Sequence, residues 1–349
     1  MVSQIENSDW LQWIERLVSG GPTVTARPSG SVPPSRSLYY CCLDDQPEFL
    51  VPERYLSSVL EKAPPDCKWV FNPECSFSKP RDVEFPNDFF ACGSSLNSNS
   101  IIWVWDAFTH SAMPYWLGPR LNELLAGIEP GAELPVGISK DILSVLKAAG
   151  IAVEENHSHS HKQRRQALEY SRQKFQDNGY VPVAQLIHPF HLASLRRYYR
   201  HHLRSGHFRC GDMQSGLRYI AHNEPIAKFF HQQLTKQISD LVGEPLKPSY
   251  SYFSTYSQGA VLEKHQDREQ CQFTVSLCID YSPEPELETP WPLRLHTERG
   301  EVLVFQGLGD ALLFRGCQIP HSRNRLGNGQ SSTSIFFHYV HKDFPGSLD

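Results

Sequence analysis

The sequence predicts an α+β fold in which a jelly-roll barrel of antiparallel strands is backed by helices and preceded by a separate mixed α/β accessory domain. Helical patterns extend to about residue 176 and recur over 189–202 and 226–242, and short strand-like runs follow Gly243 to the end of the chain. This order is typical of a barrel-like sandwich with helices on one side. A polar run over 154–162 separates this part from the residues before it. We therefore expect an accessory domain over 1–155, a helical linker over 156–179 and a C-terminal domain over 180–349.

The composition is that of a soluble globular protein. Hydrophobic residues make up 40% of the 349 positions and charged residues 20%, with a net charge of -5. This balance gives no general attraction to nucleic acid or to anionic lipids. The chain begins without a basic, apolar leader pattern and contains no apolar run long enough to span a bilayer, so we expect no membrane partner and a cytoplasmic location. Its nine cysteines include no Cys-x-x-Cys pair, which indicates reduced thiols.

Short elements are predicted along the N-terminal part. The pattern over 5–20 indicates an amphipathic helix, 101–105 a strand, and 117–126 and 141–149 two helices, the second capped by Ser139. A strand over 151–153 follows. This order over about residues 100–153 resembles the small winged-helix modules, similar to the quinone-cofactor chaperone family, that hold leader peptides. The resemblance implies a peptide-binding role; the plainer interpretation is an ordinary accessory domain.

The polar run between the two parts contains alternating histidines, His157, His159 and His161. Such a group could bind a metal, but histidines in a polar linker more often form a solvated surface.

Two amphipathic helices are expected after the linker, over 189–202 and 226–242. On the first, Leu192, Leu195 and Tyr199 share an apolar face. The opposite face is basic and is expected to be exposed, as on an ordinary surface helix; it consists of Arg196, Arg197, Arg200 and His201.

Strands account for most of the remaining pattern. The clearest is 272–281, where Phe273, Val275 and Leu277 alternate with smaller or polar residues. The other expected strands cover 180–186, 293–296, 301–305, 310–314 and 333–341.

The strongest chemical signal is the pair His265 and Asp267. The two residues follow a strand-like run and lie two positions apart, so on an extended backbone both side chains project from one face. A later histidine, His321, would complete a set of two histidines and one carboxylate. Such a set covers one face of an octahedral metal and leaves three positions open, as in non-haem Fe(II) oxygenases. His296, His338 and His341 are the competing histidines.

Residues 180–345 resemble the Fe(II)/2-oxoglutarate-dependent dioxygenases, in particular the prolyl-hydroxylase-like branch. Tyr256-Ser-Gln-Gly259 precedes His265-Gln-Asp267 as the Tyr-x-x-Gly turn precedes His-x-Asp in that family. The strand 309–314 then leads to His321, and 335–339 closes the barrel. The resemblance implies a double-stranded β-helix, a cupin-like jelly roll, that uses Fe(II), 2-oxoglutarate and O2, with His265, Asp267 and His321 as metal ligands.

The far carboxylate of 2-oxoglutarate requires a basic partner, preferably an arginine. The family commonly places this residue about ten positions after the distal histidine, where this chain has serines and Thr333. Arg323, two residues beyond His321, is our first choice because it shares a strand face with that histidine. Further candidates are Arg325, Arg268, Tyr252, Tyr256, Thr274 and Ser276. Tyr252 could simply pack, and Arg323 could pair with Asp310.

The predicted reaction is hydroxylation of an unactivated C–H bond with release of succinate and CO2. Asp267 occupies the position that would have to be small for a halide to bind, so hydroxylation is favoured over halogenation. The large N-terminal part predicts a peptide or protein substrate, with a free amino acid or small metabolite as the alternative. A catalytically silent binding protein and a cupin-type enzyme without 2-oxoglutarate are the rival classes.

Overall fold

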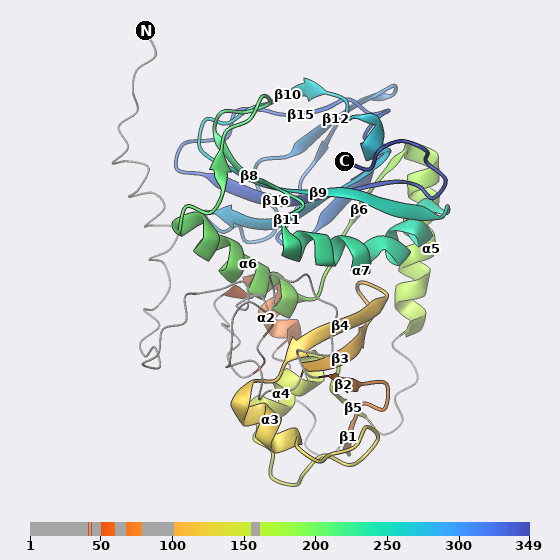
Figure 1. Cartoon of the computed structure of the whole chain (residues 1–349), viewed down its shortest axis with the longest axis vertical. Helices are drawn as coiled ribbons and strands as arrows, with labels where there is room; N and C mark the ends of the chain where they lie inside the picture. Colours follow the sequence, from red (N-terminus) through yellow and green to blue (C-terminus); the bar gives the residue numbers. More distant parts are fainter. Residues whose placement is uncertain (1–40, 42, 44–49, 60–67, 79–100, 155–160) are drawn as a thin grey trace.

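The structure is a computed structural model that describes residues 41, 43, 50–59, 68–78, 101–154 and 161–349 (Figure 1). The predicted helix over 5–20 and the histidines His157 and His159 lie outside the described residues. No helix in the described part of the chain is long and apolar enough to cross a bilayer. The cysteines within it form no disulfide.

Two antiparallel sheets face each other in the C-terminal part, which confirms the jelly-roll-like architecture. The larger sheet has the strand order β6-β14-β11-β16-β9-β8-β7, and the smaller has β10-β15-β12-β13. The larger sheet contains β6 (Tyr180–Val183), β7 (Arg209–Cys210), β8 (Arg218–His222), β9 (Leu246–Tyr256), β11 (Phe273–Ser282), β14 (Ala311–Phe314) and β16 (Ser331–His341). The smaller contains β10 (Leu262–His265), β12 (Leu293–Thr297), β13 (Gly300–Val304) and β15 (His321–Arg323).

Three helices accompany the larger sheet. They are α5 (His161–Asn178), α6 (Pro189–Arg204) and α7 (Pro225–Val242), and α6 and α7 lie against the sheet face that points away from the small sheet (Figure 1). This explains why β11 is buried along nearly its whole length. Phe273, Val275 and Leu277 pack into the main hydrophobic core, whereas Thr274 lines a pocket on the other face.

The N-terminal part contains two small sheets and three described helices. The sheets are β2-β3-β4 and β1-β5. Their strands are β1 (Trp69–Phe71), β2 (Ser76–Ser78), β3 (Ile101–Asp106), β4 (Ser111–Trp116) and β5 (Ala152–Glu154), with helices α2 (Glu53–Val59), α3 (Gly118–Leu125) and α4 (Lys140–Ala148). Ser139 caps α4 as predicted, by accepting a hydrogen bond from the Ile142 amide at 3.3 Å. The sequence reading missed β4, an edge strand that tolerates Pro114.

The hydrophobic core continues from the N-terminal part into the barrel part. One cluster of buried residues extends from Cys41 to Tyr339. Tyr115 of β4 packs against His191 of α6 at 4.6 Å between ring centroids, and His188 Nε2 lies 2.9 Å from the Ala148 carbonyl oxygen. The division into domains near residue 155 therefore stays a prediction.

The prediction of an exposed basic face on α6 is wrong for Arg196, whose side chain is completely buried. Its guanidinium donates to Asp280 at 3.1 Å, to the Leu50 carbonyl oxygen at 2.6 Å and to Glu284. Asp280 also accepts from Arg200. Through Arg196, α6 contacts both Asp280 of β11 and Leu50, which lies just before α2. The guanidinium can be buried because carboxylates neutralise its charge.

Candidate functional site

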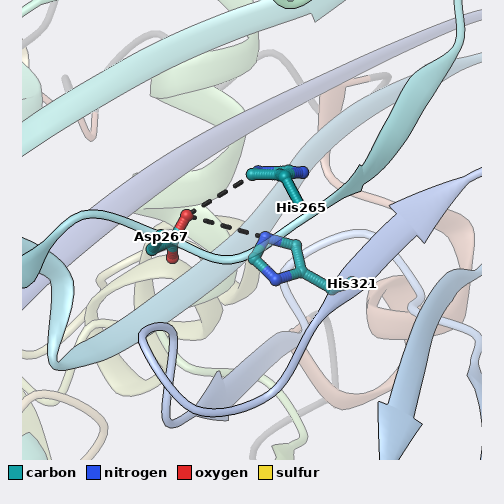
Figure 2. A group of neighbouring side chains, drawn as sticks. All are labelled: His265, Asp267 and His321. Atoms are coloured by element: carbon teal, nitrogen blue, oxygen red, sulfur yellow. Dashed lines mark ion pairs between the residues drawn. The ribbon is translucent and has the colours of Figure 1, made fainter.

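The strand pairing of the small sheet brings the predicted metal ligands together. β10 pairs with β15 so that His265 lies directly opposite His321, and Asp267 follows two residues after the end of β10. Asp267 Oδ1 lies 3.7 Å from Nε2 of each histidine, as Figure 2 shows. One ligand atom from each of the three residues lies within 4.8 Å of the others. This arrangement fits a single ion bound by two imidazoles and one carboxylate.

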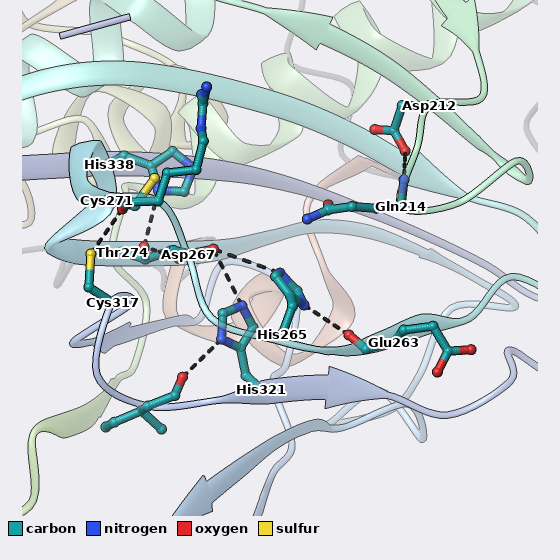
Figure 3. Close-up of polar contacts among 12 residues, drawn as sticks. Asp212, Gln214, Glu263, His265, Asp267, Cys271, Thr274, Cys317, His321 and His338 are labelled. Carbon is teal, nitrogen blue, oxygen red and sulfur yellow. Dashed lines mark hydrogen bonds and ion pairs between the residues drawn. The ribbon is translucent and has the colours of Figure 1, made fainter. Parts of the chain in front are cut away.

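Backbone carbonyl groups orient both histidines. His265 Nδ1 lies 2.8 Å from the Glu263 oxygen, and His321 Nδ1 lies 3.1 Å from the Ile319 oxygen (Figure 3). With the proton on Nδ1, each ring presents the lone pair of Nε2 toward Asp267. Burial lowers the pKa of His321, although the charge of Asp267 opposes this shift. The neutral form that a metal requires is therefore favoured at His321.

Thr274 orients the carboxylate ligand. Its hydroxyl donates to Asp267 Oδ2 at 2.7 Å, which leaves Oδ1 facing the histidines. The Thr274 oxygen lies 3.0 Å from His338 Nδ1. Because the single hydroxyl proton is used on Asp267, His338 Nδ1 must be the donor in this second contact. Burial lowers the pKa of His338 to about 4, so it supports the carboxylate as a neutral ring.

The competing histidines lie elsewhere or have other partners. His296 Nε2 contacts the Ser322 hydroxyl at 3.0 Å, and His341 Nδ1 contacts Glu244 at 3.2 Å. His338 lines the same pocket as the metal set and forms a second possible ligand group with Asp267 and Cys271. Of the four candidate histidines, His321 is therefore the one that lies beside both His265 and Asp267.

Arg323 is a buried cation that no carboxylate neutralises in the described part of the chain. Only 4% of its surface is exposed. It donates to the Trp291 carbonyl oxygen at 2.7 Å and lies 3.4 Å from Gln306 Oε1, and its guanidinium stacks on the Trp291 ring at 4.6 Å. Burial lowers the pKa of Arg323, because no carboxylate of the described residues offsets the loss of hydration. The alternative role of Arg323, an ion pair with Asp310, is not observed, since Asp310 pairs with Arg54.

Hydroxyl groups without partners lie on the interior strands. Among the described residues, the buried side-chain oxygens of Ser254, Ser276 and Tyr281 have no hydrogen-bond partner. Tyr256 lies against the Trp291 ring on which Arg323 stacks, at 5.1 Å between ring centroids. Buried polar groups normally have hydrogen-bond partners. A buried guanidinium that no carboxylate of the described residues neutralises, in a barrel with such hydroxyls on its strands, is an environment that a bound carboxylate would complete.

Tyr252 and Tyr256, the two candidate tyrosines on β9, differ in what their hydroxyl groups can still donate. The Tyr252 hydroxyl donates to Asp212 Oδ2 at 2.7 Å. The Tyr256 hydroxyl accepts from Arg218 Nη1 at 2.7 Å, so its own proton stays available for an anion. Asp212 and Arg218 were missed by the sequence reading, because neither belongs to a motif and the β7–β8 turn alone brings them together.

Arg325 and Arg268 do not reach the interior. Arg325 is exposed and donates to the Gly259 carbonyl oxygen at 3.0 Å, outside the pocket. Arg268 is exposed at the pocket mouth, above the Tyr250 ring at 5.0 Å. Of the predicted basic candidates, Arg323 alone is buried beside the strands that carry the metal set.

A pocket of about 410 Å³ contains the metal set. Leu262, Leu293 and Phe314 form its apolar wall, and the Phe314 ring lies edge-on to His321 at 4.8 Å. Every residue that lines the pocket lies at or after Arg209 in the sequence. The described residues of the N-terminal part therefore do not line it, and the role of that part in binding a peptide stays a prediction.

Comparisons with known proteins gave only structural likenesses. No family model and no curated protein matches the sequence. A prolyl-4-hydroxylase from Pseudomonas putida is 16% identical with a TM-score of 0.41, over 50% of this chain and 99% of its own. A Trichoplax adhaerens prolyl hydroxylase, in complex with a hypoxia inducible factor peptide, is 15% identical with a TM-score of 0.44, over 53% and 95%. HygX from Streptomyces hygroscopicus, with nickel and 2-oxoglutarate bound, is 12% identical with a TM-score of 0.40, over 50% and 87%.

Proposed function

We propose that the protein is an Fe(II)- and 2-oxoglutarate-dependent oxygenase that hydroxylates an unactivated C–H bond, with release of succinate and CO2. The observation that carries this proposal is the pairing of two features in one barrel. A set of two histidines and a carboxylate, His265, Asp267 and His321, lies on strands that also hold Arg323 as a buried, unneutralised cation. The first feature suits Fe(II), and the second suits the far carboxylate of a 2-oxo acid.

Each residue of the site has a defined task in this reaction. His265, Asp267 and His321 would hold the iron, while Thr274 keeps one carboxylate oxygen of Asp267 turned toward it. Bound Fe(II) with 2-oxoglutarate would supply the oxidation of the substrate by O2. Arg323 and the free proton of Tyr256 would bind and orient the far carboxylate. The apolar wall that includes Phe314 would exclude water from the reacting groups.

The proposed substrate is a side chain of a peptide or protein, with a free amino acid or small metabolite as the alternative. A volume of about 410 Å³ accommodates a co-substrate together with one side chain or one small molecule. The pocket is also partly open to solvent through exposed residues such as Arg209 and Arg268, which an extended chain can reach.

Anaerobic titration of the purified protein with Fe(II) and then 2-oxoglutarate tests the proposal. We expect a weak visible charge-transfer band that is characteristic of a 2-oxo acid chelated to Fe(II). The band should be absent in His321→Ala and retained in His296→Ala, since His296 lies outside the metal set. Both variants should first be shown to unfold cooperatively. Lack of the band in the wild type would overturn the proposal.

A further inference from the structure

Basic side chains of β7 and β8 line the mouth of the pocket. Arg209 is the cross-strand neighbour of Ile220, which shares a face of β8 with Arg218 and His222. In turn, Arg218 pairs with Tyr256 and His222 pairs with Tyr252 across β8 and β9. Arg209, Arg218 and His222 all line the pocket, as does Arg268 from the loop after the metal ligands.

The carboxylates of the pocket neutralise only part of this charge, that of Arg218. The pocket is lined by Asp212 and Asp267 alone among acidic residues. Asp212 accepts hydrogen bonds from Arg218 and Tyr252, and Asp267 belongs to the metal set. In the proposed enzyme, the two charges of 2-oxoglutarate offset those of Fe(II). Positive charge therefore remains at the mouth, although the protein as a whole carries a net charge of -5.

A carboxylate of the protein itself already lies at this mouth. Asp349 Oδ1 lies 3.0 Å from His222 Nε2. Arg268 and His222 lie against the same Tyr250 ring, the guanidinium at 5.0 Å from its centroid and the imidazole at 5.0 Å between centroids. Within the described residues, neither Arg209 nor Arg268 forms an ion pair with a carboxylate. The segment after β16 thus places one acidic side chain beside His222, at the mouth that Arg209 and Arg268 also line.

We propose that the mouth of the pocket binds a carboxylate of the substrate through Arg209, His222 and Arg268, and that Asp349 occupies this position when the substrate is absent. The inference deepens the proposed function and rests on it, because it assigns the substrate to the class of carboxylic acids. Such a group could belong to a free organic acid or to an acidic residue of a peptide. Charge-assisted hydrogen bonds from two arginines and a histidine would select it over the uncharged amide.

The test is a binding measurement on the anaerobic complex with Fe(II) and 2-oxoglutarate. Butyrate and its uncharged amide, butyramide, are titrated separately by ligand-observed NMR, together with a capped Gly-Asp-Gly peptide and methyl phosphate. We expect the acid to bind about fivefold more tightly than its amide, as charge-assisted hydrogen bonds at a partly exposed site would give. The comparison of free acid with peptide identifies the source of the carboxylate. Stronger binding of methyl phosphate than of both carboxylates would overturn the assignment to carboxylic acids.

Variants separate the mouth from general charge effects. Arg209→Gln combined with Arg268→Gln should abolish the preference for the acid, while Arg299→Gln, at an exposed arginine outside the pocket, should retain it. Asp349→Asn should strengthen binding of the acid about twofold or more by removing the internal competitor. Equal binding of acid and amide, no binding of the acid, or a preference that survives the double substitution would overturn the inference. The charge-transfer band reports 2-oxoglutarate independently, so a failure of the proposed function is recognised separately.

Discussion

Gly316 is the residue whose lack of a side chain allows the metal ligand Asp267 to keep its position. The Gly316 carbonyl oxygen accepts a hydrogen bond from the Asp267 amide at 3.1 Å. A Cβ atom added at Gly316 would lie less than 3.0 Å from Asp267 Oδ2, the Cys271 carbonyl oxygen and Thr274 Oγ1. Two of these atoms determine the direction of the carboxylate, so the collision would fall on the metal site itself.

Gly316→Ala is therefore expected to weaken Fe(II) binding by about 10- to 100-fold, as substitutions behind metal ligands commonly do. Anaerobic metal titration of the purified variant measures the effect. Gly216→Ala provides the matched control, because a Cβ atom there meets no heavy atom within 4 Å. Equal Fe(II) affinity of the Gly316 variant and wild type would contradict the expectation.

Arg323 should determine 2-oxoglutarate affinity without affecting the metal. Removing one partner of a buried, hydrogen-bonded charge pair costs about 2–5 kcal/mol, so Arg323→Met should raise the dissociation constant of 2-oxoglutarate by roughly 30-fold or more. The affinity for Fe(II) should not change, because Arg323 does not belong to the ligand group. Titrations of the charge-transfer band measure both quantities. Arg325→Met is the control at an exposed neighbour, and an equal loss in that variant would disprove the assignment.

The residues of the site were predictable from sequence where spacing along one strand determines direction. The pattern of His265 and Asp267 needs only a two-residue separation, and Arg323 follows His321 by the same step. Arg325, two residues further on, continues the alternation but lies after β15 ends at Arg323, where strand geometry no longer applies. Asp212 lies in the turn between β7 and β8, and its partners Arg218 and Tyr252 lie on β8 and β9. No spacing along one strand could therefore predict it.

At the scale of single elements, strand β11 shows that the alternation of apolar residues predicts a strand better than it predicts which faces of the strand are buried. Its alternation identified the strand correctly, yet both faces are buried because helices cover one and the barrel interior uses the other. The helical pattern of α6 was equally sound. The prediction for Arg196 was wrong because a charged side chain was expected to face solvent. Its guanidinium is instead buried in ion pairs with Asp280 and Glu284. Periodicity gives the face of a side chain but does not give its partners.

Helix α7 joins the larger sheet through His231, which should make stability depend on pH. His231 Nε2 lies 2.8 Å from the His338 carbonyl oxygen, and burial lowers the pKa of His231 to about 3. In the unfolded chain the histidine pKa is about 6.5, so on acidification the unfolded state takes up the proton first. The stability associated with neutral His231 is complete above about pH 6.5 and is lost as the pH falls toward 3.

His231→Gln removes this titration while its amide can still donate to the His338 carbonyl oxygen. The free energy of unfolding of wild type should fall between pH 6 and 4 more steeply than that of the variant, by about 1.4 kcal/mol per pH unit. Urea unfolding at several pH values measures the two slopes. His207→Gln, at an exposed histidine, is the control. Parallel slopes for wild type and His231→Gln would rule out the proposed contribution.

At the scale of the whole molecule, the barrel was predictable and its junction with the N-terminal part was not. The order of helices and strands follows from local periodicity, and the facing of two sheets follows from the need to bury their apolar faces. The continuous core depends on contacts such as Tyr115 with His191, between residues 76 positions apart in the sequence. No local pattern encodes such contacts. The polar run over 154–162 marks a connection in the chain, but it does not show whether the parts pack against each other.

The ion pair between Arg54 and Asp310 connects the N-terminal part to the barrel. Substitutions in this pair measure how much the contact contributes to the stability of the protein. Arg54 Nη2 of α2 lies 2.7 Å from Asp310 Oδ1, just before β14, and only 17% of each side chain is exposed. Asp310 also accepts hydrogen bonds from the backbone amides of Gln185 and Gly307, each at 2.9 Å. Arg54 also donates to the Leu308 carbonyl oxygen and to the Tyr55 hydroxyl, so Asp310→Asn and Arg54→Gln should each destabilise the protein.

A double-mutant cycle on this pair should give a coupling of about 1–3 kcal/mol, the range for contacting residues in one buried network. Urea unfolding of wild type, both single variants and the double variant supplies the four free energies. The cycle of Lys68→Gln with Glu133→Gln, an exposed pair at 3.4 Å, should give a coupling of only about 0–1 kcal/mol. If the N-terminal part unfolds independently of the barrel, the Arg54 and Asp310 effects will be additive and two transitions will be seen. A single transition with strong coupling would show that the two parts fold as one cooperative unit, because the energy of the ion pair then depends on both being intact.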